Sequence, residues 1–353
     1  MSKKQTKQNS LKRIFFICLS IIVLIGIVLG YFMYLVFFSS NINPNIKKDN
    51  YIIIKTGSSV QDIAMTLTEK NIIMSQSTFN FAAKILNLNS NIHPGRYLIH
   101  PHGNNKYLIK LFKSGIQIPY KLSYTGIHTR YDFAGKISQQ IEVDSSIIIK
   151  TMQSDSFCNK NNLDIENSLS YFIVDTSQYY YTTSTNEFIN KMKSFHDNFW
   201  NEEHLLKAKS IGLTKAEVAI LASIVEKETA KDSEKPIIAG LYLNRLKKKG
   251  WKLEADPTVI YAIGDYTKQR LYNNDLKVNS PYNTYKYAGL PPGPICMPTA
   301  ESMNSVLNYT HHNYMYMCAK EDFSGYHNFA HTLEEHERNA ARYYAELKRR
   351  NIH

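Results

Sequence analysis

Two glutamates near the end of one apolar segment are the residues of this chain best suited to chemistry. Glu226 and Glu228 interrupt residues 219–229, whose other side chains are mostly small or apolar. A carboxylic acid in such surroundings can act as a general acid, because burial raises its pKa and keeps it protonated at neutral pH. The segment therefore predicts a buried helix that carries an acid/base group.

Helical geometry separates the two glutamates. Thr214 and Glu217 have capping-box spacing, so the helix is predicted to begin there and Glu217 to act as a cap. At about 100° per residue, Glu226 falls on a strip of small side chains that leaves room for a ligand, whereas Glu228 falls on the opposite, crowded flank. The predicted core face consists of Val218, Leu221, Ala222, Val225 and Thr229, and the small-residue strip of Ala219, Ser223 and Ala230.

An isolated glutamate near a helix end can equally be a solvated acid. The segments that follow Glu226 in the chain favour an acid/base role. Residues 236–249 are predicted to form a second helix, which contains Asn244 and ends at a glycine. Asp256 and Pro257 then form a good N-cap and first-turn pair, which makes Asp256 a structural residue.

Two proline-rich loops come next. Ser-Pro-Tyr-Asn-Thr-Tyr occupies 280–285, and Gly-Leu-Pro-Pro-Gly-Pro-Ile occupies 289–295. Loops stiffened in this way can present polar and aromatic side chains as the wall of a sugar-binding site. An aromatic and polar strand is predicted at 325–329, followed by a closing amphipathic helix at 334–350 in which His336 is a surface or capping residue.

The N-terminal segment predicts a membrane anchor. Residues 14–38 carry no charge, and this run exceeds the roughly 20 residues that span a bilayer as a helix. A signal peptide is the alternative, but its apolar core has only ~7–15 residues, and no small-x-small cleavage site follows here. Positive charges at 1–13 and a polar linker at 39–49 place the N-terminus in the cytoplasm and the rest beyond the cytoplasmic membrane. The charges are Lys3, Lys4, Lys7, Lys12 and Arg13.

Residues 50–116 are predicted to form a small α+β module. A strand at 51–55 precedes a helix that starts at Ser58, which has capping-box spacing to Gln61, and a second strand is expected at 95–99. This strand–helix–helix–strand order resembles the LysM module, a small glycan-binding fold, although a plain α+β spacer would show the same pattern. The second helix is predicted to start near Ser77 and to bury Phe79, Phe81, Ala82 and Ile85, and a last helix to cover 105–112.

Residues 117–205 are predicted to be a connecting subdomain without chemistry. Its expected elements are a strand at 118–124, a helix at 132–141, an aromatic β-prone stretch at 170–181 and a helix at 186–200. Asp175 and His196 are interpreted as surface or capping residues. Residues 206–353 then form a larger α+β domain that carries Glu226.

Composition and cysteine spacing exclude other classes of function. The formal net charge of +12 is partly due to the N-terminal tail, and no compact basic patch interleaved with aromatics indicates nucleic-acid binding. The four cysteines show no CxxC or Cys/His spacing, so structural zinc is not predicted. Cys18 lies in the apolar run. The other three are predicted to be buried thiols, with a Cys158–Cys296 or Cys296–Cys318 disulfide as the alternative.

Six short motifs follow one another along the chain. They are Leu-Ala-Ser-Ile-Val-Glu-Lys-Glu-Thr at 221–229, Asn-Arg-Leu at 244–246, Asp-Pro-Thr-Val-Ile-Tyr at 256–261, the two proline-rich loops, and His-x-Phe at 327–329. In this order they resemble the MltG (YceG-like) family of membrane-anchored endolytic transglycosylases, which cut peptidoglycan strands. The chain departs from the family pattern at 174–177, where Val-Asp-Thr-Ser replaces Pro-Asp/Asn-Thr-Tyr, and at 124–127, where Tyr-Thr-Gly-Ile replaces a Pro-Glu-Gly turn. These departures are expected to affect local turns only.

The resemblance implies a fold and a reaction. The fold is an α+β YceG-like catalytic domain behind one transmembrane helix, and the reaction cleaves the bond between N-acetylmuramic acid and N-acetylglucosamine without water. Glu226 matches the family's catalytic acid, which protonates the glycosidic oxygen. The resulting carboxylate then takes the proton of the sugar's 6-hydroxyl, and a 1,6-anhydro ring closes. Ordinary glycosidases use two carboxylates, for which Glu254 and Asp256 are the candidates in a hydrolase.

The same resemblance implies a substrate and partners. Peptidoglycan glycan strands are the expected substrate, peptidoglycan synthases are expected to cooperate, and no metal or cofactor is implied. Two alternatives stay open, a non-catalytic glycan-binding scaffold for cell-wall enzymes and a muramidase-type hydrolase. The residues expected to contact substrate are Ser223, Asn244, Glu254, Tyr282, Asn283, Tyr285 and His327, with Asp256 and Glu228 as structural neighbours of the site.

Overall fold

The fold is that of a computed structural model, which describes residues 3–47, 50–174, 176–268 and 270–352. Most regular structure is helical. The strands among the described residues form three two-stranded sheets, so the chain combines helix and sheet as predicted.

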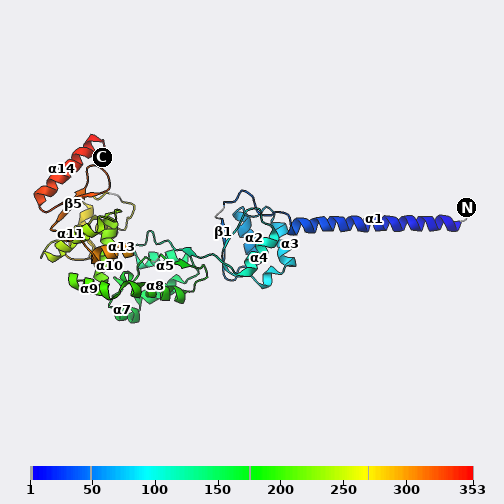
Figure 1. Ribbon diagram of the computed structural model, residues 1–353, viewed down its shortest axis with the longest axis horizontal. Helices are drawn as coiled ribbons and strands as arrows, with labels where there is room; N and C mark the ends of the chain where they lie inside the picture. The colour runs from blue at the N-terminus through cyan, green and yellow to red at the C-terminus, as the bar shows by residue number, and fades with distance from the viewer. Residues whose placement is uncertain (1–2, 48–49, 175, 269, 353) are drawn as a thin grey trace. The chain divides into compact units, whose positions relative to one another are not determined.

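Backbone contacts divide the chain into two compact units, drawn in Figure 1. Unit 1 comprises Met1–Tyr120 and Gln178–Thr182, and unit 2 comprises Lys121–Ser177 and Thr183–His353. Most of the segment 117–205 therefore belongs to the same unit as the helix that carries Glu226. The subdomain boundary at residue 205 stays a prediction.

Among its described residues, unit 1 has one long helix, a two-stranded sheet, three shorter α-helices and a 3-10 turn (Figure 1). The sheet is antiparallel, with Tyr51 opposite Leu98 and Ile54 opposite Gly95. The predicted strand–helix–helix–strand order is confirmed, whereas the likeness to LysM stays a prediction. The elements are α1 (Lys3–Phe37), β1 (Tyr51–Ile54), α2 (Val60–Glu69), α3 (Gln76–Ile85), η1 (Leu88–Ser90), β2 (Gly95–Leu98) and α4 (Asn105–Ser114).

Helix α1 contains the predicted apolar run. Within it, Arg13–Phe37 is long and apolar enough to cross a membrane, with a mean hydropathy of 2.9. The last turn is different, because Val36 is fully buried and the helix packs there against α3 and α4. The side-chain amide of Asn105 donates to the carbonyl oxygen of Val36 at 2.8 Å, so this helix end is satisfied within the core of unit 1.

Residues 39–47, which fall in the expected linker, pack into unit 1. Ile42 is fully buried, and the amide of Asn41 donates to the side-chain oxygen of Asn105 at 2.7 Å. Residues 48–49 lie outside the described part of the chain. The chain after α1 thus continues directly into the packed unit.

The capping box of α2 lies one residue later than predicted. Ser59, not Ser58, is the N-cap, and Asp62 takes the place expected for Gln61. The Asp62 carboxylate accepts from the backbone N–H of Ser59 at 2.8 Å. An ionised acceptor also interacts favourably with the positive end of the helix dipole, which an amide does only weakly.

The buried face of α3 was predicted only in part. Phe79 and Ala82 are buried as expected, but Phe81 and Ile85 are 38% and 54% exposed. The third buried position is Ala83. A stripe three and four residues apart from Phe79 therefore faces the core, and the two larger side chains lie outside it.

Unit 2 is mainly helical (Figure 1). The strand β3 (Tyr120–Lys121) falls at the sequence boundary between the units, and β4 (Gln178–Tyr179) belongs to unit 1. The elements of unit 2 are α5 (Arg130–Ser138), α6 (Ser145–Gln153), α7 (Asp155–Asn161), η2 (Ser168–Tyr171), α8 (Thr185–Phe199), α9 (Glu202–Ile211), α10 (Lys215–Glu228), α11 (Lys235–Lys247), α12 (Asp256–Ile263), η3 (Asp275–Lys277), α13 (Ala300–Leu307), β5 (Tyr316–Ala319), β6 (His327–Ala330) and α14 (Leu333–Arg349).

Helix α10 is at the centre of the unit 2 core. It packs against α9, α11, α12 and α13. The capping box predicted from Thr214 and Glu217 is confirmed. All eight residues from Val218 to Val225 are buried, so the core surrounds the helix instead of covering one face. Of the predicted strip, Ala219 and Ser223 are among these buried residues and Ala230 is exposed, so the strip offers no free room at Ala219 and Ser223.

The segment before α9 is less regular than predicted. The strand expected at 118–124 is reduced to β3, and the β-prone stretch forms η2 and the short strand β4. His196 is only 6% exposed and stacks on Tyr171 with ring centroids 4.0 Å apart, so its assignment to the surface was wrong. Asp175 lies outside the described residues.

The C-terminal elements are those expected, with one addition. The strand predicted at 325–329 is β6, which pairs antiparallel with β5, a strand that was not predicted. The closing helix is α14. His336 is half-buried and stacks on Tyr316 with ring centroids 5.4 Å apart, so it packs instead of capping.

Removal of the cap should weaken unit 2. Thr214→Ala deletes the oxygen that accepts from the Glu217 backbone N–H at 3.2 Å, and should cost about 1 kcal/mol of unfolding free energy. Thr214→Ser keeps the acceptor and should cost much less. Both tryptophans, Trp200 and Trp251, lie in unit 2, so fluorescence during urea unfolding follows this unit. Identical midpoints for Thr214→Ala and the unmodified protein would contradict the assignment.

Candidate functional site

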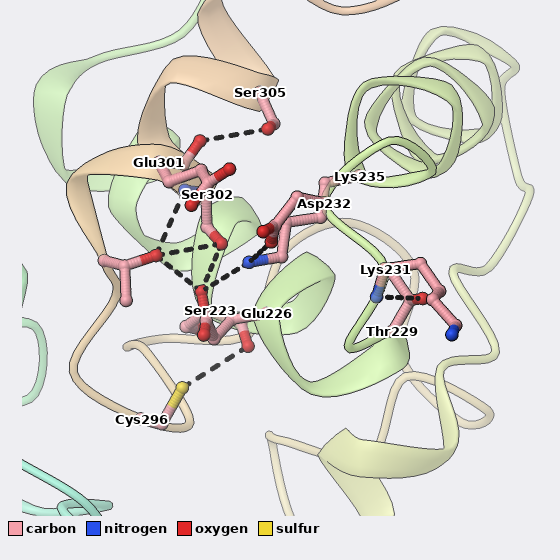
Figure 2. A network of polar contacts seen from close by, with 11 residues as sticks. Ser223, Glu226, Thr229, Lys231, Asp232, Lys235, Cys296, Glu301, Ser302 and Ser305 are labelled. Carbon is pink, nitrogen blue, oxygen red and sulfur yellow. Dashed lines mark hydrogen bonds and ion pairs between the residues drawn. The ribbon is translucent and has the colours of Figure 1, made fainter. Parts of the chain in front are cut away.

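The side chain of Glu226 is held by three donors from two neighbouring helices (Figure 2). Thr299, the N-cap of α13, donates its hydroxyl to Oε2 at 2.6 Å, and Ser302 in the first turn of α13 donates to the same oxygen. The ammonium of Lys235, the first residue of α11, lies 3.3 Å from Oε2. Glu226 is therefore an anchored carboxylate at the meeting point of α10, α11 and α13.

Lys235 is a buried cation between two acids. Its side chain is only 6% exposed, and its ammonium lies 3.0 Å from Asp232 as well as close to Glu226. A buried charge must be paired, because transfer from water is costly. Burial disfavours its charged form, but contacts with Asp232 and Glu226 outweigh this and raise the pKa of Lys235. The site thus keeps one positive charge beside Glu226.

The environment of Glu226 lowers the pKa of its carboxyl, whereas the sequence predicted that it would rise. Burial favours its neutral form, but hydrogen bonds from Ser302 and Thr299, with the charge of Lys235, outweigh burial and hold the pKa of this carboxyl below its ordinary value. The predicted upward shift was wrong. The apolar residues around Glu226 in sequence do not include the donors that α11 and α13 bring to it.

A cavity of about 420 Å³ opens at Glu226. Its other walls come from residues 121–127, from Val174 and Thr176, and from residues of α10 and of the loop before α13. The walls therefore include part of the segment that was expected to have no chemistry. Both departures from the family pattern, at 124–127 and 174–177, contribute to this lining.

Ser223 is covered by the second proline-rich loop. Ser223 is fully buried, and its hydroxyl donates to the Ile220 carbonyl oxygen at 2.7 Å and accepts from the backbone N–H of Ile295 at 3.0 Å. The thiol of Cys296 also points to this helix, 3.5 Å from the Ser223 carbonyl oxygen (Figure 2). The loop thus occupies the small-residue strip. A role of Ser223 in substrate binding stays a prediction, which this burial does not favour.

The first proline-rich loop is fixed by its own side chains. Asn283 is fully buried, and its amide donates to the carbonyl oxygens of Leu276 and Val278, each at 2.9 Å. Tyr285 donates its hydroxyl to Asp256 at 2.6 Å. Neither Asn283 nor Tyr285 lines the Glu226 cavity. Their predicted contacts with substrate stay untested, and the structure gives both a role within the loop.

Asn244, Glu254 and His327 also lie away from the lining of that cavity. The amide of Asn244 donates to the His312 carbonyl oxygen at 2.8 Å and so ties α11 to the chain after α13. The ring of His327 is 2.9 Å from the buried carboxylate of Glu234. Their roles as substrate ligands stay predictions.

Glu254 and Asp256, the candidates for a second carboxylate in a hydrolase, each have a side-chain partner. Glu254 is half-exposed and has a left-handed backbone, with φ of 51°, and its carboxylate is 3.7 Å from Arg245. Asp256 is the first residue of α12, whose N-cap is Ala255 without a side-chain cap, so its predicted capping role was wrong. Its carboxylate binds Tyr285 instead, as described above.

Glu228 has its own partners on the other side of α10. Tyr242 of α11 donates its hydroxyl to the Glu228 carboxyl at 2.5 Å. Burial raises the pKa of Glu228 to about 7, with a smaller contribution from Asp256, while the Tyr242 hydrogen bond and Arg245 oppose the shift. The separation of the two glutamates predicted from helix geometry is thus matched by separate sets of partners.

Among the described residues, no group of three or more His, Cys, Asp or Glu side chains is placed to hold a metal ion. The four cysteines are free thiols; Cys158 and Cys296 are buried, Cys318 is partly buried and Cys18 is exposed. Neither alternative disulfide is formed.

Three residues in contact with Glu226 were missed in the sequence. These are Lys235, Thr299 and Ser302, of which the last two lie more than 70 positions away in the chain. Of the three, Thr299 alone has a local signal in the sequence, because threonine is a preferred N-cap residue and this one follows the second proline-rich loop. That signal predicts a helix start and says nothing about Glu226.

Residues 52–342 match the YceG-like family. The chain belongs to that family. It is 28% identical over 305 residues to an endolytic murein transglycosylase of Bacillus subtilis (strain 168), a match that covers 82% of this chain and 83% of the relative.

Two further relatives extend this comparison. An endolytic murein transglycosylase of Streptococcus pneumoniae (serotype 2, strain D39) is 27% identical over 344 residues, and the match spans 88% of this chain but only 62% of that protein. The crystal structure of a YceG-like protein from Listeria monocytogenes matches with 27% identity and a TM-score of 0.50, and the match covers 82% of this chain and 98% of that one. The YceG-like family resemblance inferred from the six motifs is confirmed.

The donors of α13 should control the proton affinity of Glu226. Ser302→Ala removes one hydrogen bond to the carboxylate, so the pKa of Glu226 should rise. The measurement is a carbon-13 NMR titration of glutamate carboxyls, with the Glu226 signal assigned by its loss in Glu226→Gln. Ser305→Ala is the matched control, because the Ser305 hydroxyl donates to the Glu301 carbonyl oxygen at 2.9 Å instead (Figure 2). Equal pKa values for Glu226 in the two variants would refute the assignment.

Glu228 should make stability depend on pH. Its pKa is about 7 when folded and 4.5 for the ordinary group, so the folded state binds more protons between these values. The stabilisation is complete below pH 4.5 and is lost as the pH rises through 7. Glu228→Gln keeps an acceptor for Tyr242 and should flatten this slope in urea unfolding. Glu337→Gln, an exposed control on α14, should leave the slope unchanged.

Proposed function

We propose that this chain is a membrane-anchored endolytic peptidoglycan lytic transglycosylase. The observation that carries the proposal is Glu226, an anchored carboxylate beside a cavity of about 420 Å³, in a family whose curated relatives are named endolytic murein transglycosylases. The bond cleaved is that between N-acetylmuramic acid and N-acetylglucosamine in glycan strands.

Glu226 serves both halves of the reaction. As an acid it gives its proton to the glycosidic oxygen, and the bond from that oxygen to the anomeric carbon of N-acetylmuramic acid breaks. As a carboxylate it then takes the proton of the 6-hydroxyl of the same sugar, whose oxygen bonds to the anomeric carbon. The proton lost in the first step is regained in the second, and no water is consumed.

The partners of Glu226 suit this exchange. A hydroxyl has one donor and two acceptor lone pairs, so Thr299 and Ser302 can donate to the carboxylate and can accept from the protonated acid after rotation. Lys235 can only donate. It stabilises the anion, which is the form that the second step requires. The lowered pKa therefore favours the base role, and the acid role draws on the smaller protonated fraction.

Helix α1 supports the membrane-bound part of the proposal. One apolar helix spanning Arg13–Phe37 is sufficient for a single pass across the cytoplasmic membrane. The basic tail before it favours a cytoplasmic N-terminus, with unit 2 on the outer side where peptidoglycan lies. We also propose, from the family resemblance alone, a LysM-like role for unit 1 and cooperation with peptidoglycan synthases.

Digestion of peptidoglycan tests the reaction. The protein should release glycan fragments with 1,6-anhydro ends, identified by mass spectrometry, and Glu226→Gln should lower the rate at least about a hundredfold because the acid/base group is lost. Glu217→Gln is the control on the same helix, since glutamine also completes a capping box.

The products also separate the alternatives. Reducing-end sugars in place of anhydro sugars would identify a hydrolase. Absence of products from a folded protein that still binds strands would identify a scaffold. Either result would refute the proposed reaction.

A further inference from the structure

A second cavity adjoins the one at Glu226. It measures about 140 Å³, and Lys227 lines both cavities. Its other walls include the rings of His128, Tyr261 and Tyr266. Lys227 directly follows Glu226 on α10, so the second cavity lies beside the one at Glu226.

His128 and Tyr266 form a fixed aromatic platform in the second cavity. Their ring centroids are 3.6 Å apart and their planes differ by 5°. The Nδ1–H of His128 is 3.1 Å from the carbonyl oxygen of Ile295, which it meets as donor in the neutral tautomer, and burial lowers the pKa of this imidazole. Tyr266 remains 42% exposed. A ring that is held on one face and open to solvent beside a cavity loses little entropy when a ligand covers it.

Further aromatic rings continue from this platform. Tyr261 lies 6.3 Å from Tyr266, and Tyr282 lies 4.5 Å from Tyr261, measured between ring centroids. Tyr261 and Tyr282 line a third cavity of about 200 Å³, which His128 also borders. The three cavities are therefore linked by shared side chains, all within unit 2. Tyr261 and Tyr282 are partly buried and pack against the core of unit 2, so Tyr266 is the exposed ring of this group and the one that can stack on a sugar.

Lys227 supplies an unpaired positive charge at the start of this row. It is exposed, and it makes no salt bridge or hydrogen bond with the residues that the structure describes. The other lysine of the second cavity, Lys268, is already bound to Asp275 at 2.8 Å. Lys227 is thus the cation of this lining that is available to a ligand, and a carboxylate is its natural partner.

We propose that Lys227, His128 and Tyr266 form a glycan subsite beside the catalytic one, in which a sugar ring stacks on Tyr266 and Lys227 binds a carboxylate of the strand. This inference rests on the proposed function for the identity of the strand. The carboxylate has two possible sources, the stem peptide or the lactyl group of peptide-free N-acetylmuramic acid. Lys227 thereby selects peptidoglycan over neutral glycans.

Equilibrium binding tests the subsite in the full-length Glu226→Gln protein, which does not depend on cleavage. The probes are strands with stem peptides, strands stripped of them, and chitin oligosaccharides, which have no carboxylate. Lys227→Gln should weaken binding of a carboxylate-bearing strand about tenfold and leave chitin binding unchanged. If Lys227→Gln weakens binding of the complete strands only, the carboxylate belongs to the stem peptide. If it weakens binding of the stripped strands, the carboxylate is that of the lactyl group. Lys249→Gln removes an exposed charge outside these cavities and should change nothing.

The aromatic platform has its own variants. Tyr266→Ala should weaken binding of all three probes, whereas Tyr266→Phe keeps the ring and should bind normally. In the active enzyme, Lys227→Gln should raise KM with little change in kcat, because it acts on binding alone. Equal loss of chitin and strand binding in Lys227→Gln, or normal binding by Tyr266→Ala, would overturn the inference.

These measurements keep the two proposals apart. Cleavage by the unmodified protein with no effect of Lys227→Gln would sustain the enzyme and overturn the subsite. Selective loss of binding in Lys227→Gln with no cleavage by the unmodified protein would sustain the subsite and overturn the enzyme.

Discussion

The contact of Glu226 with Thr299, Ser302 and Lys235 is the interaction on which the organisation of unit 2 depends. It joins the last turn of α10 to the first turns of α11 and α13, and all donors converge on one carboxylate oxygen. The first turns of α11 and α13 provide both the donor side chains and the positive ends of two helix dipoles. An ionised carboxylate that is partly withdrawn from water, as Glu226 is, is stabilised by such partners. The same contact therefore fixes the helices and determines the charge of the candidate catalytic group.

Local sequence information was sufficient to predict the helices that begin with clear caps. Thr214 and Glu217 specify the start of α10 because a capping box involves residues only three positions apart. The apolar run of α1 and the strand–helix–helix–strand order of unit 1 are local in the same sense. Errors of one residue, as at Ser59, arise where adjacent residues can both cap.

Long-range contacts account for most of what the sequence could not predict. The pKa of Glu226 was predicted to rise but is lowered, because its donors come from α11 and α13. The carboxyl whose pKa is raised, by burial, is that of Glu228, which lies next to the Tyr242 hydroxyl of α11. Similarly, residues 121–127 form a wall of the cavity although their own sequence shows no chemistry. The spacing of residues within one helix gives their faces, but the elements that cover those faces are known only from the packed structure.

The buried end of α1 has a mechanical consequence in the proposed membrane-bound form. Val36 lies in the core of unit 1, and Asn105 binds its carbonyl oxygen, so the helix passes into the folded unit without a hinge. Unit 1 then cannot rotate freely about its anchor. Its height above the bilayer and its orientation follow the tilt of α1, and a change in membrane thickness would be transmitted to unit 1 as a rigid-body displacement.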